Sequence, residues 1–246
     1  MTASGSPAMR FFPLFATAIA MAMAAAGSVA APPAPPRAAG AESGAYVWNK
    51  AGGEKDRALR LKGDPDRGRT AYEVCQGCHR PDGSGRADGS YPQLAGQHAS
   101  VLIKQMSDIR AGQRDNPKMF PFAGEHVISV QEIADIAAHL QRLGIPPDNG
   151  KGSGTALERG ERLYRSDCKA CHRANGEGDP KKFYPVLAGQ HYSYLLRQSR
   201  EIRDGNRRNA NPRMIRVVRG YDDEDLAAVA DYMSRRTLPE RGKSGK

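Results

Sequence analysis

A chain of 246 residues is long enough for one large domain or two small ones, and its 27 glycines and 17 prolines do not make it collagen-like or of low complexity. Hydrophobic residues make up 39% and charged residues 26% of the chain, which argues against intrinsic disorder of the whole chain and against a polytopic membrane fold. The net charge of +10 is compatible with nucleic acid, anionic lipid or an acidic protein as the partner. The positions of the four cysteines therefore decide between these classes.

The chain begins with the features of an export signal. Arg10 precedes a nearly unbroken apolar run from Phe11 to Ala26, and Ser28-Val29-Ala30 has the form of a signal-peptidase site. Residues 1–30 are therefore predicted to be a cleaved signal peptide, with an uncleaved membrane anchor as the alternative. Residues 31–63 follow as an Ala- and Pro-rich spacer and N-terminal extension, which contains the only tryptophan, Trp48.

The rest of the chain contains one unit twice. The motif at residues 75–79, Cys-Gln-Gly-Cys-His, recurs 93 positions later at residues 168–172 as Cys-Lys-Ala-Cys-His. Residues 91–98 and 184–191 keep the same offset and share the pattern Tyr-Pro-x-Leu-Ala-Gly-Gln-His. A repeat of this length indicates duplicated domains. The predicted organisation is domain 1 at residues 64–145, a Gly- and Pro-rich linker at 146–154, domain 2 at 155–237 and a basic tail at 238–246.

Both units are predicted to be mainly α-helical, because strand patterns are weak throughout. A short helix leads into each cysteine motif, with Tyr72 and Tyr164 as its packing residues. Middle helices are expected before Gly112 and Gly205, where apolar residues recur at helical spacing. The last helix of domain 1 starts at the capping box 129–132, and that of domain 2 starts in the acidic cluster 222–225. The predicted fold class is all-α, with two tandem domains.

The Cys-x-x-Cys-His motifs are typical of covalent haem attachment. One helical turn presents two thiols to the two vinyl groups, and the next residue offers an imidazole to the iron. The alternatives are a zinc site, a dithiol redox pair and plain disulfides. A zinc site on the four cysteines would bridge two domains that each repeat their own histidine. A dithiol pair expects a βαβ setting, which is missing here, and plain disulfides do not explain the two histidines. The sequence therefore predicts two haem c groups, with the candidate residues Cys75, Cys78, Cys168 and Cys171 as attachment points and His79 and His172 as axial ligands.

The duplication also selects the sixth ligand of each iron. Met119 and Met214 both close an Asn-Pro-basic-Met tetrapeptide, whereas Met106 and Met233 occur in one copy each and are expected to be core residues. Met119 and Met214 are therefore the predicted distal ligands. The histidine alternatives are His98 and His191, which recur but are expected to pack or hydrogen-bond, and His126 and His139, which occur in the first copy only.

Two prolines are predicted to support the axial histidines. Pro92 and Pro185 recur at the common offset. A proline carbonyl that accepts the imidazole N–H would fix the orientation and the basicity of the ring.

From about Asp66 to Arg236 the chain resembles the dihaem class I cytochromes c, and most closely cytochrome c4. The resemblance is carried by the two Cys-x-x-Cys-His motifs, the twin segments at 91–98 and 184–191, the two distal methionines and the last helix of each unit. It implies two packed cytochrome c folds, His–Met ligation at both irons and electron delivery between respiratory complexes in the periplasm.

The charge is distributed unequally between the two units. Residues 67–148 carry nine basic and nine acidic side chains, whereas residues 149–246 carry 21 basic and 13 acidic ones, so the second half holds +8 of the net charge. Many of these arginines surround Met214. The hypothesis is a docking face for an acidic redox partner, formed by Arg207, Arg208, Arg213 and Arg216; the alternative is a solvated basic face.

Three classes of function follow from these features. The first is a mobile electron carrier between a quinol-oxidising complex and a terminal oxidase. The second is a haem subunit of a periplasmic dehydrogenase, such as a sulfide or alcohol dehydrogenase. The third is an enzyme, either a dihaem peroxidase or a thiosulfate-oxidising cytochrome, which the matched Met119 and Met214 disfavour. Redox proteins are the expected partners, peripheral membrane association remains open, and nucleic acid is not expected.

Overall fold

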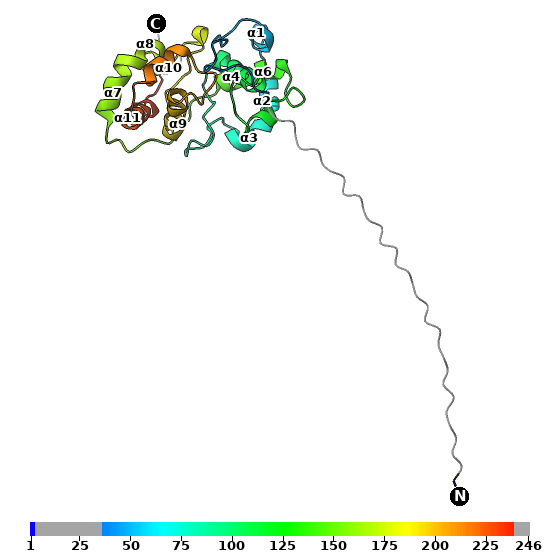
Figure 1. Ribbon diagram of the computed structural model, residues 1–246. Coiled ribbons are helices and arrows are strands. Elements are labelled where there is room, and N and C mark those ends of the chain that lie inside the picture. Colours follow the sequence, from blue (N-terminus) through cyan, green and yellow to red (C-terminus); the bar gives the residue numbers. More distant parts are fainter. Residues whose placement is uncertain (3–35, 239–246) are drawn as a thin grey trace. The chain divides into compact units, whose positions relative to one another are not determined.

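The computed structural model describes residues 1–2 and 36–238 of the chain (Figure 1). The predicted signal peptide and basic tail lie almost wholly outside the described residues. Within residues 36–238 the regular structure is helical, and the single β-bridge there joins Asp179 and Tyr184. In the same range no helix has both the length and the apolar character that a bilayer crossing requires.

The helices of the two units are grouped separately (Figure 1). The N-terminal extension and domain 1 contain α1 (Gly53–Arg60), α2 (Pro65–Ala71), α3 (Glu73–His79), α4 (Ala99–Arg110), α5 (Phe120–Ala123) and α6 (Val130–Arg142). Domain 2 contains α7 (Leu157–Leu163), the π-helical turn η1 (Tyr164–Cys168), α8 (Lys169–His172), the 3₁₀ turn η2 (Pro180–Lys182), α9 (Tyr192–Arg203), α10 (Pro212–Val218) and α11 (Asp223–Ser234). The predicted all-α fold with two tandem domains is confirmed.

The predicted helix starts are confirmed by their caps. The Ser129 hydroxyl accepts from the N–H of Glu132 at 3.2 Å, and the Glu132 carboxylate accepts from the N–H of Ser129 at 2.7 Å, so α6 begins with a complete capping box. At α11 the Asp222 carboxylate accepts from the N–H of Asp225 at 2.7 Å. Helix α1 was not predicted, because the extension lies outside the repeat.

In each domain two helices cross at a glycine. The pairs are α2 and α6 in domain 1, and α7 and α11 in domain 2. A Cβ atom on Gly68 in α2 would lie 2.0 Å from the carbonyl oxygen of Asp135 in α6. A Cβ atom on Gly160 in α7 would lie 2.1 Å from the carbonyl oxygen of Ala228 in α11. Only a residue without a side chain permits this approach of two backbones. The cysteine motif follows the first of these two helices directly in each domain.

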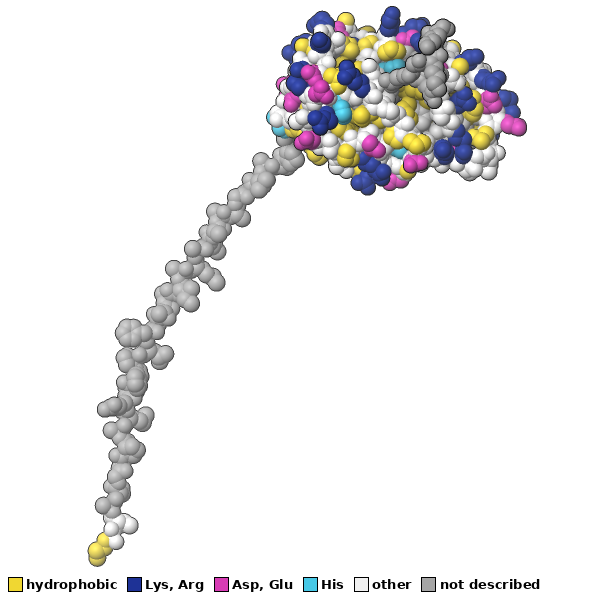
Figure 2. All heavy atoms as spheres, turned by 180° about the vertical axis from the view of Figure 1, so that it is seen from behind, with side chains coloured by type: hydrophobic (Ala, Val, Ile, Leu, Met, Phe, Trp, Pro, Cys, Tyr) yellow, Lys and Arg dark blue, Asp and Glu magenta, His cyan; other side chains and the backbone are white. Residues whose placement is uncertain are grey.

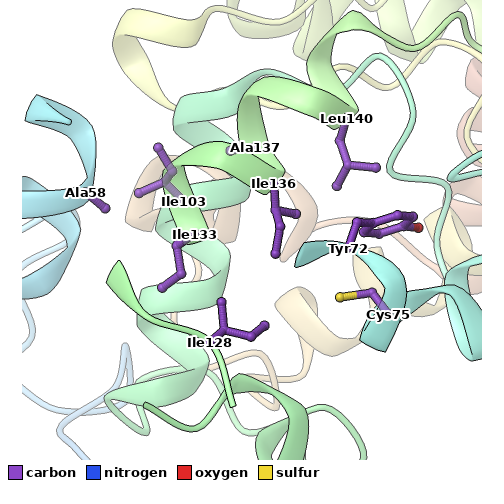
Figure 3. Packing of buried hydrophobic residues seen from close by; sticks show 9 residues of the cluster. All are labelled: Ala58, Tyr72, Cys75, Ile103, Ile128, Ile133, Ile136, Ala137 and Leu140. Carbon is purple, nitrogen blue, oxygen red and sulfur yellow. The ribbon is translucent and has the colours of Figure 1, made fainter. Parts of the chain in front are cut away.

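Each domain has a core built around the predicted tyrosine. Figure 3 shows Tyr72 and Cys75 packed with the isoleucines and Leu140 of domain 1. Tyr72 and Tyr164 are both fully buried, and their hydroxyl groups donate to the carbonyl oxygens of Arg80 and Arg173 at 3.0 and 2.7 Å. These two bonds tie the first helix to the residue that follows each histidine. Met106 packs against the core of domain 1 and Met233 is buried in domain 2, as predicted.

The two domains are joined by a duplicated set of glutamine hydrogen bonds. The side chain of Gln190 accepts from the N–H of Gln93 at 3.0 Å and donates to its carbonyl oxygen at 2.9 Å. The side chain of Gln97 makes the same pair of bonds to the backbone of Val186, at 2.9 and 3.0 Å. Gln97 and Gln190 are equivalent in the repeat, and so are Gln93 and Val186. The interface is therefore approximately two-fold symmetric.

The recurring histidines belong to the same interface. Nε2 of His98 lies 2.7 Å from the carbonyl oxygen of Glu177 in domain 2, and Nε2 of His191 lies 2.8 Å from the carbonyl oxygen of Ser84 in domain 1. Ser84 and Glu177 are again equivalent positions. Hydrogen bonding by His98 and His191 is thus confirmed, and it holds the two domains together.

Candidate functional site

The cysteine motif lies on one helix in domain 1, and in domain 2 it spans a π-helical turn and the short helix that follows. Cys75, Cys78 and His79 lie on α3, while Cys168 ends the turn η1 and Cys171 lies on α8. The first cysteine of each motif is buried, and burial raises the pKa of the Cys75 thiol to about 11 and that of Cys168 to about 12.

The zinc and disulfide alternatives find no support in this geometry. None of the four cysteines is in a disulfide. Among the residues that the structure describes, no group of three or more His, Cys, Asp and Glu side chains is arranged to hold a metal ion. Figure 3 shows the Cys75 sulfur on the side of α3 that faces Ile128 and Ile136. Cys75 faces an apolar wall, and Cys168 and Cys171 line a mainly apolar cavity, which suits attachment of an apolar ring.

Both axial histidine candidates are buried and are held by a proline carbonyl. Nδ1 of His79 lies 3.0 Å from the carbonyl oxygen of Pro92, and Nδ1 of His172 lies 3.2 Å from that of Pro185. Burial lowers the pKa of His79 and lowers that of His172 to about 4, against the smaller opposite effect of the two carbonyls. Because a carbonyl only accepts, Nδ1 carries the proton of the neutral ring. Nε2 is left with a free lone pair, as a metal ligand needs.

A tyrosine packs against each of these imidazoles. The ring centroids of Tyr91 and His79 lie 5.9 Å apart, and those of Tyr184 and His172 lie 6.2 Å apart. Each tyrosine immediately precedes the proline whose carbonyl holds the histidine. The repeated Tyr-Pro dipeptide thus fixes the ring in two ways, through packing and through a hydrogen bond.

The candidate residues of domain 2 meet in a cavity of about 250 Å³, and residues of domain 1 form part of its wall. Cys168, Cys171, His172 and Met214 all line it. The wall is mainly apolar, with contributions from α9, α10 and α11 of domain 2 and from α4 of domain 1. Three cations also line the cavity: Arg114, Arg207 and Arg213. Apolar walls with a few cations match a flat ring that carries two carboxylates, so the residues present fit a haem.

The two candidate methionines are half-buried but differ in local structure. Met214 is the third residue of α10, which starts at Pro212. Met119 precedes α5 and closes a turn in which its N–H donates to the carbonyl oxygen of Asn116 at 3.0 Å. The difference follows from Pro121 in domain 1, because a proline is tolerated only in the first turn of a helix and α5 must start next to it.

The two histidines that occur only in the first copy were expected to have a surface or core role, and the structure agrees. His126 is exposed. His139 is half-buried on α6, and its ring centroid lies 5.9 Å from that of Tyr72.

Comparison with known proteins identifies the family. The family model described as "Cytochrome c" matches residues 65–144 and again residues 157–237. The chain belongs to the cytochrome c family. It is 34% identical to the cytochrome c4 of Azotobacter vinelandii over 190 residues, which is 70% of this chain and 88% of that protein. It is also 34% identical to a "Thiosulfate dehydrogenase electron acceptor" of Stutzerimonas stutzeri, over 70% of this chain and 83% of that protein.

A solved structure shows the same relationship. The crystal structure of reduced recombinant cytochrome c4 from Pseudomonas stutzeri matches 72% of this chain and all of that chain, with a TM-score of 0.65 and 30% identity. Together with the two family matches, this makes the chain a dihaem class I cytochrome c similar to cytochrome c4. Its two domains carry two covalent haem c groups, and it is an electron-transfer protein of this cytochrome family.

The predicted docking face needs a correction at two of its four arginines. Arg208 is buried and donates to the Glu42 carboxylate at 2.8 Å. Arg207 donates to the side-chain oxygens of Gln198 and Gln105 at 2.9 and 3.1 Å, and burial lowers its pKa to about 10. Both guanidinium groups are enclosed where the two domains meet, so neither is available to a partner. Arg213 and Arg216 are exposed, as the hypothesis requires.

Sequence reasoning missed the glutamines of the interface and the role of the N-terminal extension. Gln97 and Gln190 could have been found, because a polar residue that recurs in both copies without a chemical task has to serve a shared structural one. Trp48 lines the domain 2 cavity, although it lies outside the repeat. No pattern in the sequence could have placed it there.

Proposed function

We propose that each domain holds its haem with the residues that the duplication selects. Cys75 and Cys78 attach one haem, with His79 and Met119 as its axial ligands. In domain 2 the corresponding residues are Cys168, Cys171, His172 and Met214. The observation that carries this proposal is that both copies hold the imidazole with the same tyrosine and the same proline carbonyl.

A haem with histidine and methionine ligands takes up and releases one electron with little rearrangement. The protein supplies the conditions for this reversibility. Pro92 and Pro185 fix the orientation of the two imidazoles, and burial keeps the rings neutral. Since both sites have a candidate methionine, neither is reserved for a substrate. This arrangement favours electron carriage over peroxidase or thiosulfate-oxidising chemistry.

The role that we assign to the protein is electron transfer in the periplasm from a quinol-oxidising complex to a terminal oxidase. The similarity to cytochrome c4 and the export signal expected at residues 1–30 support it. The second candidate is service to a periplasmic dehydrogenase. The relative named as a thiosulfate dehydrogenase electron acceptor favours that candidate specifically.

The docking face on domain 2 consists of Arg213, Arg216 and Arg219. All three are exposed and lie in or just after α10, which carries Met214. Within residues 36–238 neither Arg216 nor Arg219 forms an ion pair with a carboxylate. On the face seen in Figure 2, Lys and Arg side chains lie in several separate groups among acidic and hydrophobic ones. Because the positive charges are spread over the molecule, net charge alone does not define a docking site. The exposed arginines beside Met214 form a defined patch near a haem.

Replacement of the candidate methionines tests the ligand assignment. Met119→Ala and Met214→Ala should each remove about half of the sulfur–iron charge-transfer absorption of the ferric protein and lower one of two midpoint potentials, because each variant loses one thioether ligand. Met106→Leu, in the domain 1 core, is the control and should retain the whole band. A Met119 or Met214 variant with the full band would exclude that residue as a ligand.

Rates with purified partners test the biological role. The reduced protein should be oxidised faster by a haem–copper oxidase at low than at high salt, and Arg213→Glu with Arg216→Glu should slow the reaction and weaken its salt dependence. Arg162→Glu, on the exposed surface of α7, is the control for a charge change elsewhere on domain 2. Fast reduction by a thiosulfate dehydrogenase, with slow oxidation by the oxidase, would favour the second candidate.

A further inference from the structure

The N-terminal extension is fixed to both domains, although the family match begins only at residue 65. At the C-terminal end of the extension, α1 packs against domain 1. Ala58 is fully buried in the core of that domain, and the Glu54 carboxylate pairs with Arg110 at 2.7 Å. At the N-terminal end of the extension, the N–H of Ala41 donates to the carbonyl oxygen of Arg208 in domain 2 at 2.7 Å. The segment between these two anchors is held across the molecule.

Trp48 lies between the anchors and reaches the cavity of domain 2. Its ring stacks on that of Tyr184, with centroids 6.3 Å apart and an interplanar angle of 27°. The ammonium group of Lys104 from domain 1 lies 5.5 Å from the centre of the indole ring. Trp48 lines the cavity together with His172 and Met214. Tyr184 in turn packs on His172, so the indole ring is the outer member of an aromatic stack that ends at the axial imidazole.

A second contact holds the extension against the same loop of domain 2. The ammonium group of Lys55 on α1 lies 5.5 Å from the ring centre of Phe183, the neighbour of Tyr184. Lys55 is buried and also donates to the side-chain oxygen of Asn49 at 2.7 Å. These bonds fix the backbone on the C-terminal side of Trp48. The position of the indole ring is therefore determined by contacts on several sides.

Domain 1 has a different neighbour at the equivalent place. Tyr91, the counterpart of Tyr184, carries the guanidinium group of Arg86 at 5.4 Å from its ring centre. Arg86 is exposed, whereas Trp48 is half-buried. The extension thus introduces an asymmetry between two sites that the duplication made alike.

We propose that residues 38–60 form a built-in cover of the domain 2 haem site and that Trp48 is the residue of this cover that sets the potential of that haem. The proposal rests on the function and ligands proposed above. Trp48 acts as a positioning and shielding residue: it holds Tyr184 against His172 and closes one wall of the cavity to water. Exclusion of water disfavours the extra positive charge of the ferric state, so the cover raises the midpoint potential of this haem above that of an open site.

Potentiometric titration of the holoprotein tests this role. Trp48→Ala should shift one of the two midpoint potentials to a lower value and leave the other unchanged. Trp48→Leu, which keeps an apolar side chain, should shift the same midpoint by less. The exposed neighbour Val47 supplies the matched control, and Val47→Ala should leave both midpoints in place. In a Met119→Ala background the haem of domain 1 is marked by its lost ligand, so the shift must appear in the haem that retains its charge-transfer band.

The outcomes separate this inference from the proposed function. A wild-type protein without two low-spin haems would overturn the function, whatever Trp48 does. Unchanged midpoints in both Trp48 variants, with two intact charge-transfer bands, would overturn the cover alone. A shift in the haem of domain 1 would also overturn it. If Trp48→Ala does not fold, Trp48→Leu still tests the proposal. A second measurement is the rate at which added imidazole displaces the methionine of domain 2. This rate should be higher in the variant, because an opened cavity admits imidazole faster than the covered one.

Discussion

The glutamine bonds between the domains predict how much Gln190 contributes to the interface. Gln190 is 7% exposed and makes two hydrogen bonds to the backbone of Gln93 in the other domain. A net hydrogen bond contributes about 0.5–1.5 kcal/mol, so Gln190→Ala should cost about 1–3 kcal/mol. The upper part of this range is expected, because the N–H and carbonyl groups of Gln93 would remain buried without a partner.

The equivalent change at Gln97 should cost less. Its two bonds to Val186 are as short, but Gln97 is half-buried and water can replace the lost amide. We expect about 1 kcal/mol for Gln97→Ala. Since both residues hold one interface, the double variant should lose more than the sum of the two single variants.

Urea denaturation of the holoprotein, followed by circular dichroism, measures these differences. Loss of the interface should also broaden the single transition into two and speed protease cleavage within residues 146–154. Gln190→Met is the control for packing, since it keeps the side-chain volume and loses both bonds. The reasoning is refuted if Gln190→Ala changes the unfolding free energy by less than about 0.5 kcal/mol, the scatter expected of a neutral surface change.

Two further predictions concern single domains. Gly160→Ala should destabilise domain 2 by about 1–3 kcal/mol in thermal unfolding, because its Cβ would meet the carbonyl oxygen of Ala228. The control is Gly220→Ala, which should be neutral because a Cβ there has no neighbour within 4 Å. Equal melting temperatures of the two variants would contradict the close crossing of the helices. Burial alone would raise the pKa of Asp135, but hydrogen bonds from Arg67 and its neighbours hold it below the ordinary value, so its stabilising contribution is present above about pH 4 and is lost as the pH falls through the lowered pKa. Asp135→Asn should therefore cost about 1–3 kcal/mol at pH 7 and flatten the acid limb of the stability curve, and a variant with an unchanged acid limb would contradict this role.

The sequence was sufficient to predict the first, middle and last helices of each repeat and the candidate ligands, because both depend on local or repeated information. The capping box at Ser129 and Glu132 marks a helix start by itself. Met119 and Met214 were selected over the other methionines by recurrence, which is independent of any fold. The Pro92 and Pro185 contacts followed from chemistry, because a ligand imidazole needs an acceptor for its second nitrogen.

Contacts between side chains that are far apart in the sequence could not be predicted from it. Arginines on a polar segment indicate a surface, yet Arg207 and Arg208 are paired with Gln105 and Glu42, which lie more than a hundred residues away. Helix α1 has a polar sequence, and its place in the core depends on Ala58 and on the ion pair of Glu54 with Arg110. Neither pairing is marked by a pattern in the neighbouring sequence. The burial of a charged side chain can therefore be predicted only when its partner is known.

The duplicated ligands and the unequal surroundings together predict a direction for electron flow. Identical ligand sets alone would give the two haems similar potentials. Domain 2, however, lies in the half of the sequence that carries +8, and it is covered by Trp48; both features disfavour the ferric state there. We therefore expect the haem of domain 2 to have the higher potential, so that an electron received through domain 1 settles beside the exposed arginines of α10, where an acidic acceptor would dock.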